Sequence, residues 1–175
     1  ESTNIILNNE RTFNIMNNCV FCNRQKIEED ILAESPNFIV MVGFGVITPG
    51  HILLTSKEHL SCYGALPPHL KSEFLKTRSI VSKTIEDIFA KPFQMEYGVW
   101  GQSVPHAHIH FIPERNTDYL VNSIMDELFS KAGVRIEKAS FERMQEIFRE
   151  DGGYVMIEEL ENNFVAHVLG LPPIN

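Results

Sequence analysis

Basic residues are scarce in this sequence, which limits the class of partner. Lysine and arginine number 15 against 23 acidic residues, and the net charge at pH 7 is −8. Long nucleic acid is held by basic surfaces that neutralise its phosphates. We therefore expect no long nucleic acid among the partners. A single nucleotide needs only a few local donors, so a small phosphate ligand is compatible with this charge.

Long apolar runs are absent and cysteine is rare. No run of 18 or more apolar residues occurs, so we expect no membrane-spanning segment and no membrane partner. The three cysteines are too few for a disulfide scaffold, and residues 1–18 lack the basic-then-apolar pattern of a signal peptide. We therefore expect a cytoplasmic protein. Its 175 residues, 43% of them hydrophobic, suffice for one domain with a sizeable core.

Three histidines recur at every second position near the middle of the chain. They lie in the stretch Gly101-Gln-Ser-Val-Pro-His-Ala-His-Ile-His-Phe-Ile-Pro113. Alternation with apolar residues predicts a strand, on which side chains two apart share a face about 6.5–7 Å from one another. A strand gains no packing from three imidazoles in a row, so we interpret them as a functional site. The residues alone leave two chemistries open, a metal site or a nucleophile with helpers.

A pair of cysteines precedes this stretch by about eighty residues. Cys19-Val-Phe-Cys22 can hold one metal ion from a tight turn. The same spacing also occurs in redox motifs, but these normally open a helix after a strand. The following residues, 23–27, show little helical amphipathy at first. A zinc ion would need two more ligands from elsewhere; His51 and His59, taken singly, look like ordinary surface or turn histidines.

The rest of the pattern predicts an α+β protein. Runs of β-forming residues predict strands at 37–42, 51–56, 93–97 and 106–112. Apolar residues at three- and four-residue spacings predict one long helix over 69–90. Beyond these, the sequence predicts helices at 123–131 and 139–150 and a hairpin of strands at 154–158 and 163–168. The expected parts are an N-terminal arm (1–18), a compact domain (19–113) and a C-terminal extension packed on it (114–175).

Four motifs in this order resemble the histidine triad (HIT) family. His106-Ala-His-Ile-His-Phe-Ile112 resembles the triad itself, and Gly101-Gln-Ser-Val104 is similar to the segment that precedes it. Gly50-His-Ile-Leu-Leu54, followed by Lys57-Glu-His59, is similar to an earlier segment, and Cys19-Val-Phe-Cys22 resembles the opening of the zinc-bearing members. The resemblance spans about residues 19–113. It implies a HIT-like antiparallel sheet of about five strands with a long helix on one face, to which the tail adds a helix and hairpin.

The resemblance implies a nucleotide hydrolase or nucleotidyltransferase acting at the α-phosphate of a nucleotide ester, anhydride or phosphoramidate. The middle histidine, His108, would be the nucleophile and would form a covalent nucleotidyl-histidine intermediate. His110 and Ser103 would donate hydrogen bonds to the non-bridging oxygens. His51 would help to orient the phosphate, and Gln102 with the Gly101 backbone would complete the cradle.

The resemblance also implies a zinc ion and an assembly. In zinc-bearing members the first triad histidine is a ligand, so the expected set is Cys19, Cys22, His59 and His106. Four protein ligands make a closed, structural site, which here would tie the N-terminal arm to the catalytic strand. Many members are dimers, so a homodimer is expected by likeness, with the extension either covering the dimer surface or contributing to the pocket.

One departure from the family pattern concerns the nucleoside. Many nucleotide-hydrolysing members place an acidic residue eight positions before the histidine of the Gly-His segment, which is His51 here, and this residue holds the ribose hydroxyls. Here that position is Gly43, and no carboxylate occurs between Pro36 and Pro49. Glu96, expected in the loop before the triad, also differs from the amide of some members. We therefore expect the phosphate chemistry to carry over better than nucleoside recognition.

Two other functions compete with this one. A non-catalytic nucleotide-binding or protein-interaction module could keep the same fold, although the intact histidines and Ser103 argue against a decayed site. A catalytic transition-metal site on the three histidines is the other alternative. Neighbouring histidines on one strand are too widely spaced to be good ligands of a single ion without distortion of the strand.

Overall fold

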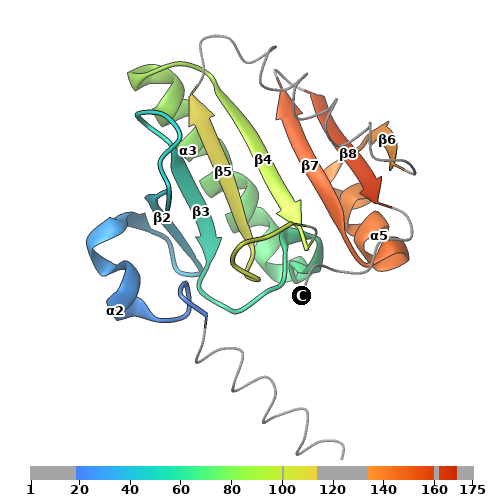
Figure 1. The fold of residues 1–175 in the computed structure, drawn as a ribbon, viewed down its shortest axis with the longest axis horizontal. Helices are drawn as coiled ribbons and strands as arrows, with labels where there is room; N and C mark the ends of the chain where they lie inside the picture. The colour runs from blue at the N-terminus through green and yellow to red at the C-terminus, as the bar shows by residue number, and fades with distance from the viewer. Residues whose placement is uncertain (1–18, 100, 114–133, 160–161, 169–175) are drawn as a thin grey trace, which may run out of the picture.

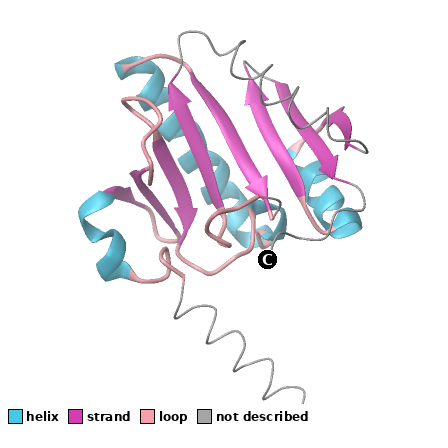
Figure 2. Cartoon of the chain, in the orientation of Figure 1, coloured by secondary structure: helices cyan, strands magenta, loops and turns pink. Residues whose placement is uncertain are grey.

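The protein, seen in a computed structural model, is an α+β fold built on one antiparallel sheet (Figures 1 and 2). The structure describes residues 19–99, 101–113, 134–159 and 162–168. Within them the strands are β1 (Ile31–Glu34), β2 (Phe38–Val42), β3 (Ile52–Ser56), β4 (Pro92–Gly98), β5 (His108–Pro113), β6 (Val134–Lys138), β7 (Tyr154–Glu159) and β8 (Asn162–Val168). The α-helices are α2 (Arg24–Ile27), α3 (Lys71–Ile88) and α5 (Phe141–Asp151). No helix in these residues is long and apolar enough to cross a membrane.

The sheet has the order β1-β2-β3-β5-β4-β7-β8-β6. Its first five strands, β1 to β5, are the predicted sheet of about five strands, and the prediction is confirmed. The sequence predicts four of these strands within about two residues of their observed bounds. It does not predict β1, whose sequence is only Ile-Leu-Ala-Glu. One expectation was wrong: the triad strand begins at His108, so His106 lies in the turn before it.

Helix α3 covers one face of the sheet and leaves the other to the histidines. Its buried residues Phe74, Val81 and Ile85 recur on one side of the helix. They pack in one cluster with Ile109 and Phe111 of β5. Figure 1 shows α3 lying behind the strands. Because side chains alternate along a strand, the histidines of β5 point to the opposite face.

The C-terminal segment continues the same sheet and the same core. Strand β7 pairs with β4 from Gln94↔Glu158 to Gly98↔Tyr154, and β8 returns antiparallel to β7. Helix α5 is capped at its N-terminus by Ser140, whose side chain accepts from the Arg143 amide, and at its C-terminus by Gly152, which has a φ of 80°. Its apolar side joins the cluster under α3. The helix expected at 123–131 and the arm at 1–18 lie outside the described residues, and the division of the chain at residues 18 and 113 stays a prediction.

Glu96 lies in β4, fully buried, which corrects its expected position in a loop. Its carboxylate accepts hydrogen bonds from the Tyr63 amide at 2.7 Å and the Tyr154 hydroxyl at 2.5 Å. Burial raises the pKa of Glu96 to about 7, and these two donors together with the charge of Arg78 oppose the rise. Cys62 packs nearby and has a raised pKa of its own. Glu96 is therefore part of the core that joins β4 to β7.

Replacing Glu96 with glutamine should make the stability of the protein less sensitive to a rise in pH from 4.5 to about 7. A carboxyl whose pKa rises on folding stabilises the fold below its ordinary value of 4.5, and this contribution is lost as pH rises to about 7. The difference corresponds to at most about 3 kcal/mol. Relative to the native protein, Glu96→Gln should gain stability between pH 4.5 and pH 8 in urea unfolding. Parallel pH dependences of the two proteins would contradict this expectation.

Candidate active site and metal centre

Three of the predicted histidines lie together on the sheet face opposite α3. His108 and His110 lie on β5, where their backbones pair with Thr55 and Leu53 of β3. His51 directly precedes β3 and is 2% exposed. The rings of His108 and His110 are 5.1 Å apart, and those of His51 and His110 are 5.2 Å apart. The fold thus gathers these three imidazoles from two neighbouring strands.

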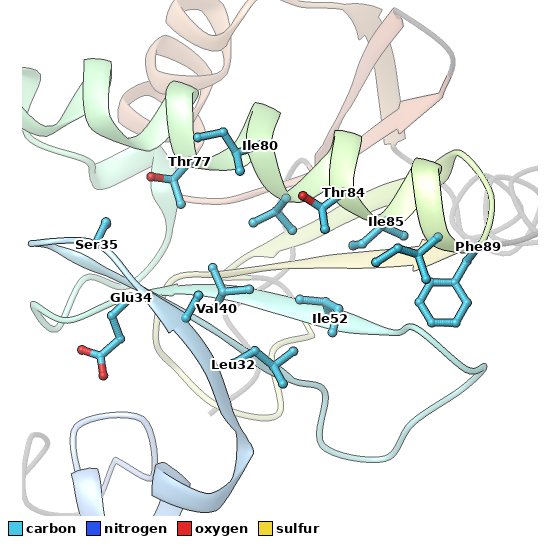
Figure 3. A pocket seen from close by; sticks show the side chains of 13 residues that line it. Leu32, Glu34, Ser35, Val40, Ile52, Thr77, Ile80, Thr84, Ile85 and Phe89 are labelled. Atoms are coloured by element: carbon cyan, nitrogen blue, oxygen red, sulfur yellow. The ribbon is translucent and has the colours of Figure 1, made fainter.

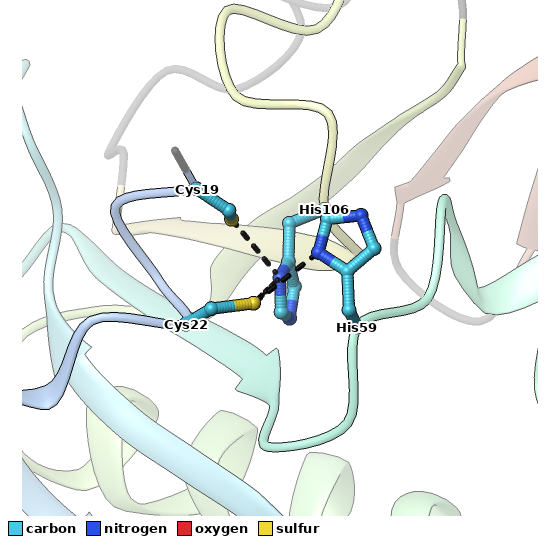
Figure 4. A group of neighbouring side chains, drawn as sticks. All are labelled: Cys19, Cys22, His59 and His106. Carbon is cyan, nitrogen blue, oxygen red and sulfur yellow. Dashed lines mark hydrogen bonds between the residues drawn. The ribbon is translucent and has the colours of Figure 1, made fainter. Parts of the chain in front are cut away.

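His106, the first triad histidine, faces the two cysteines instead. Its Nδ1 lies 3.4 Å from Cys19 Sγ and 3.5 Å from Cys22 Sγ, and Cys22 Sγ lies 3.2 Å from His59 Nδ1. One ligand atom from each of these four residues lies within 4.8 Å of all the others. Figure 4 shows the two thiols and two imidazoles converging on one point. The structure therefore brings together the four residues that the sequence predicted as metal ligands.

The dimensions of this group fit a tetrahedral metal ion. Zinc bonds of about 2.0–2.3 Å give ligand-to-ligand separations of about 3.3–3.8 Å, close to the three S–N distances of 3.2–3.5 Å in this group. The His106 Nε2–H donates to the Ser56 carbonyl at 2.8 Å. Because a carbonyl only accepts, the proton is on Nε2 and the lone pair of Nδ1 points at the thiols. A second hydrogen bond that fixes the tautomer is typical of metal-binding histidines.

The backbone carbonyl of His106 holds the ring of His108 in one orientation. Its Nδ1 lies 2.5 Å from the backbone carbonyl of His106, to which it must donate. The neutral ring then carries its lone pair on Nε2. The side chain is 4% exposed, and burial lowers the pKa of His108, so the imidazole is neutral at pH 7. A neutral, oriented imidazole with a free Nε2 is a suitable nucleophile.

A chain of hydrogen bonds fixes the tautomers of His51 and His110. The Ile47 amide donates to His51 Nδ1 at 3.4 Å, so the His51 proton is on Nε2. That nitrogen lies 3.0 Å from His110 Nδ1 and donates to it. Burial, then the neighbouring His108 and His51, lowers the pKa of His110 to about 3. Neutral His110 therefore has its one proton on Nε2, where it can be donated.

Gly43 explains how His51 reaches this position. A Cβ on Gly43 would lie 2.9–3.1 Å from three atoms of the His51 ring, closer than real contacts allow. The Gly43 amide also donates to the His51 carbonyl at 3.2 Å. The position at which the resemblance implies a carboxylate thus lies directly against the imidazole. An aspartate has the same Cβ, so it would require a different placement of His51.

Gly43→Ala should lower turnover without unfolding the protein. The added methyl group must displace the His51 ring by a few tenths of an ångström and disturb its hydrogen bond to His110. We expect kcat of the proposed reaction to fall about tenfold, because small misplacements of catalytic groups are costly. Gly45→Asn is the matched control: nothing lies within 4 Å of that Cβ, and asparagine tolerates the φ of 66°. Equal activities of the two variants would contradict this role for Gly43.

The predicted cradle residues lie in the loop before β5. Gly101 has a φ of 75°, which favours glycine. The Gln102 side chain donates from Nε2 to the Ser61 carbonyl at 2.8 Å and so ties the loop to a neighbouring segment. Ser103 is exposed. Their contact with a phosphate stays a prediction.

Sequence reasoning missed three contributors to the site. Phe21 packs its ring edge-on against His106 and His108, with centroids 5.7 and 5.3 Å apart, and stacks on Phe44. Its only signal in the sequence was its place between the two cysteines. The Ser56 carbonyl and the Ile47 amide act through the backbone, so their side-chain identities carried no signal.

An apolar groove lies on the other side of the sheet, between α3 and strands β1 to β3 (Figure 3). Its volume is about 480 Å³. Leu32, Ile80, Ile88 and Phe89 line it and are exposed. No histidine or cysteine lines it, so we assign the chemistry to the histidine face.

Known proteins share this pattern. The HIT domain family model matches residues 24–117, which include all of the histidines discussed above. The bis(5′-nucleosyl)-tetraphosphatase (asymmetrical) of Schizosaccharomyces pombe is 30% identical over 83 residues, which are 45% of this chain and 46% of that protein. The chain therefore spans about half the length of this curated relative.

Solved structures of HIT proteins also match. A HIT-like protein involved in cell-cycle regulation from Bartonella henselae is 21% identical, with a TM-score of 0.51, over 56% of this chain and 78% of that one. A HIT family hydrolase from Clostridium thermocellum is 28% identical, with a TM-score of 0.46, over 55% of this chain and 90% of that one. The match to the Bartonella protein is a likeness of fold.

Proposed function

The chain belongs to the histidine triad (HIT) family, and from that premise we propose that it is a nucleotide hydrolase or nucleotidyltransferase. Its substrate would be a nucleotide ester, anhydride or phosphoramidate, attacked at the α-phosphate. The observation that carries the proposal is the orientation of His108. Its Nδ1–H is tied to the His106 carbonyl, which leaves Nε2 as a lone-pair donor on a buried, neutral ring.

The proposed reaction has two displacements at phosphorus. His108 Nε2 forms a bond to the α-phosphorus. The bond between this phosphorus and the leaving group breaks, and the leaving group departs with the electron pair. The leaving group then acquires a proton from a neighbouring donor or solvent. In the second step a water molecule or another acceptor attacks the same phosphorus and loses its proton to solvent or a neighbouring base. The bond to Nε2 breaks, and its electron pair returns to the imidazole. With water as the acceptor the protein is a hydrolase, and with another acceptor it is a transferase.

His110 would stabilise the charge that develops in both steps. Its proton is on Nε2, because His51 donates to its Nδ1. A neutral donor aimed at the non-bridging oxygens costs little reorganisation and acts strongly in a buried site. Ser103, Gln102 and the Gly101 backbone would supply further donors from the loop. His51 would act through His110 as well as by contact with the phosphate.

We infer that the Cys19, Cys22, His59 and His106 group holds zinc. Two thiolates and two imidazoles are the donor set that zinc prefers, and four protein ligands leave no open position for a substrate. When bound, the ion would supply structural support rather than Lewis-acid chemistry. These residues hold the turn that carries the His106 carbonyl, the acceptor that orients His108.

The nucleoside would be held mainly by apolar contacts. Phe44 is exposed and stacks on the buried Phe21, which packs against His108, and Val46 and Ile47 are exposed in the same loop as Phe44. No carboxylate replaces the missing one at Gly43 within the loop 43–50. A substrate with an aromatic base suits these surfaces, whereas the ribose hydroxyls find no acidic partner there. The name of the Schizosaccharomyces pombe relative makes dinucleoside tetraphosphates the first compounds to try.

The proposal is tested by intact mass spectrometry after brief mixing with an adenosine phosphoramidate or a dinucleoside tetraphosphate. We expect a nucleotidyl adduct on the native protein, located at His108 by peptide mapping, and release of AMP. Turnover that persists after removal of metal from the solution would exclude the catalytic-metal alternative. A folded, zinc-loaded protein that forms neither adduct nor AMP with either substrate would overturn the proposal and favour the non-catalytic binding module.

A further inference from the structure

Tyr154, at the start of β7, fills two spaces that only glycine leaves open. A Cβ on Gly98 would lie 2.4–2.6 Å from three atoms of the Tyr154 ring. A Cβ on Gly64 would lie 2.7 Å from the same ring and equally close to Phe148 of α5. The ring itself is fully buried. The C-terminal segment therefore inserts one aromatic side chain between two backbone segments of the triad domain.

The Tyr154 hydroxyl links the same two segments through hydrogen bonds. It donates to Glu96 Oε2 at 2.5 Å and accepts from the Gly64 amide at 2.9 Å. The other oxygen of Glu96 accepts from the Tyr63 amide at 2.7 Å. The segment 63–64 and the end of β4 are thus held together by one buried hydroxyl and one buried carboxylate.

The chain that leaves this point enters the loop before the triad. Val99 has a φ of 80°, a left-handed conformation that a β-branched residue adopts only when its surroundings impose it. Its backbone forms a bridge to Tyr154. Two residues further on, the loop reaches Gly101 and then Gln102, whose amide is tied to Ser61. Tyr154 therefore contacts the backbone at Gly98 and Val99, the residues from which this loop starts.

We propose that Tyr154 is a positioning residue for the reaction. Through Gly98 and Val99 it fixes the loop that carries Gln102 and Ser103, and through Gly64 and Glu96 it fixes the segment to which Gln102 is tied. The C-terminal segment then supports the active site through Tyr154, a residue that is not itself assigned to the phosphate. This inference rests on the proposed function, because it assigns the loop to the phosphate cradle.

The first test compares two variants that each lose one hydroxyl. Tyr154→Phe keeps the ring between the two glycines and removes the hydroxyl. Ser35→Ala is the control, since its half-buried hydroxyl donates to Glu73 Oε1 at 2.6 Å on the groove side of the sheet. With metal content and the unfolding transition checked for both, we expect kcat for AMP release to fall about tenfold or more in Tyr154→Phe and less than about twofold in Ser35→Ala. Equal losses in the two variants would overturn the proposal.

A double-mutant cycle with Ser103→Ala distinguishes positioning from general destabilisation. If Tyr154 acts through the loop, the removal of its hydroxyl should matter little once the loop has lost its donor. We expect the effect of Tyr154→Phe to shrink to less than about threefold in the Ser103→Ala background. Multiplicative effects would overturn the inference, and so would an unchanged rate in Ser103→Ala alone. If the native protein itself released no AMP, the proposed function would fail together with this inference. If the native protein is active but the variants behave as in the two overturning outcomes above, only the role of Tyr154 fails.

Discussion

His108→Ala is expected to release AMP at least about 10⁴-fold more slowly than the native protein. The substitution removes the Nε2 lone pair, and the neighbouring imidazoles have other partners. His106 Nδ1 faces the thiols, and His110 Nδ1 accepts from His51. Loss of a covalent nucleophile typically costs several orders of magnitude, and the remaining donors give only residual acceleration. Rates of AMP release with substrate in excess measure the effect.

The control for this variant is His69→Ala, the same substitution at an exposed histidine. It should retain the native rate. Equal metal content and unfolding midpoints in all three proteins would show that the loss in His108→Ala is one of chemistry. A His108→Ala protein with a tenth of the native rate would contradict the assignment of the nucleophile.

Removal of the metal should destabilise the fold strongly. An ion present at a thousandfold excess over its dissociation constant stabilises the folded state by about 4 kcal/mol. Cys22→Ser weakens one of four ligands, and a strong chelator removes the ion from the native protein. We expect both treatments to lower the midpoint of urea unfolding, and the chelated protein to recover when zinc is added back. Elemental analysis reports the metal content in parallel.

Cys62→Ala is the matched control, because Cys62 is buried but belongs to a different part of the core. Cys62→Ala should bind one zinc ion per chain, and its metal content should equal that of the native protein. Protein that was never exposed to chelator and contains no zinc would sink the structural role, as would a chelated protein with an unchanged unfolding midpoint.

Spacing in the sequence was enough to find the three histidines of the triad, whereas the resemblance supplied the other candidate site residues. Alternation marked β5 and placed Ile109 and Phe111 in the core, opposite the histidines. The metal group could not be derived from the spacing of the cysteines alone, since its other two ligands lie 37 and 84 residues from Cys22. Resemblance to a family supplied those two ligands, and the geometry then brought the four together.

What the sequence did not predict depends on contacts made through space. His106 leaves the strand pattern because its side chain turns toward the thiols, which no local periodicity records. Glu96 has the same alternation as an exposed strand residue, yet it is buried because Tyr154 and the Tyr63 amide satisfy it. Gly43 stood out in the sequence only as a missing carboxylate, and the close approach of the His51 ring gives the glycine a structural reason.

The spread of the metal ligands along the chain has a consequence for biosynthesis. Cys19 and His106 are 87 residues apart, and His59 lies between them. A growing chain therefore offers a metal ion only two thiols until the third and fourth ligands have left the ribosome and the sheet has closed. Because a site that is not preformed in the unfolded chain binds only as folding proceeds, the ion should be captured late. Metal retention would then mark completed chains, while truncated ones would carry an exposed, oxidisable cysteine pair.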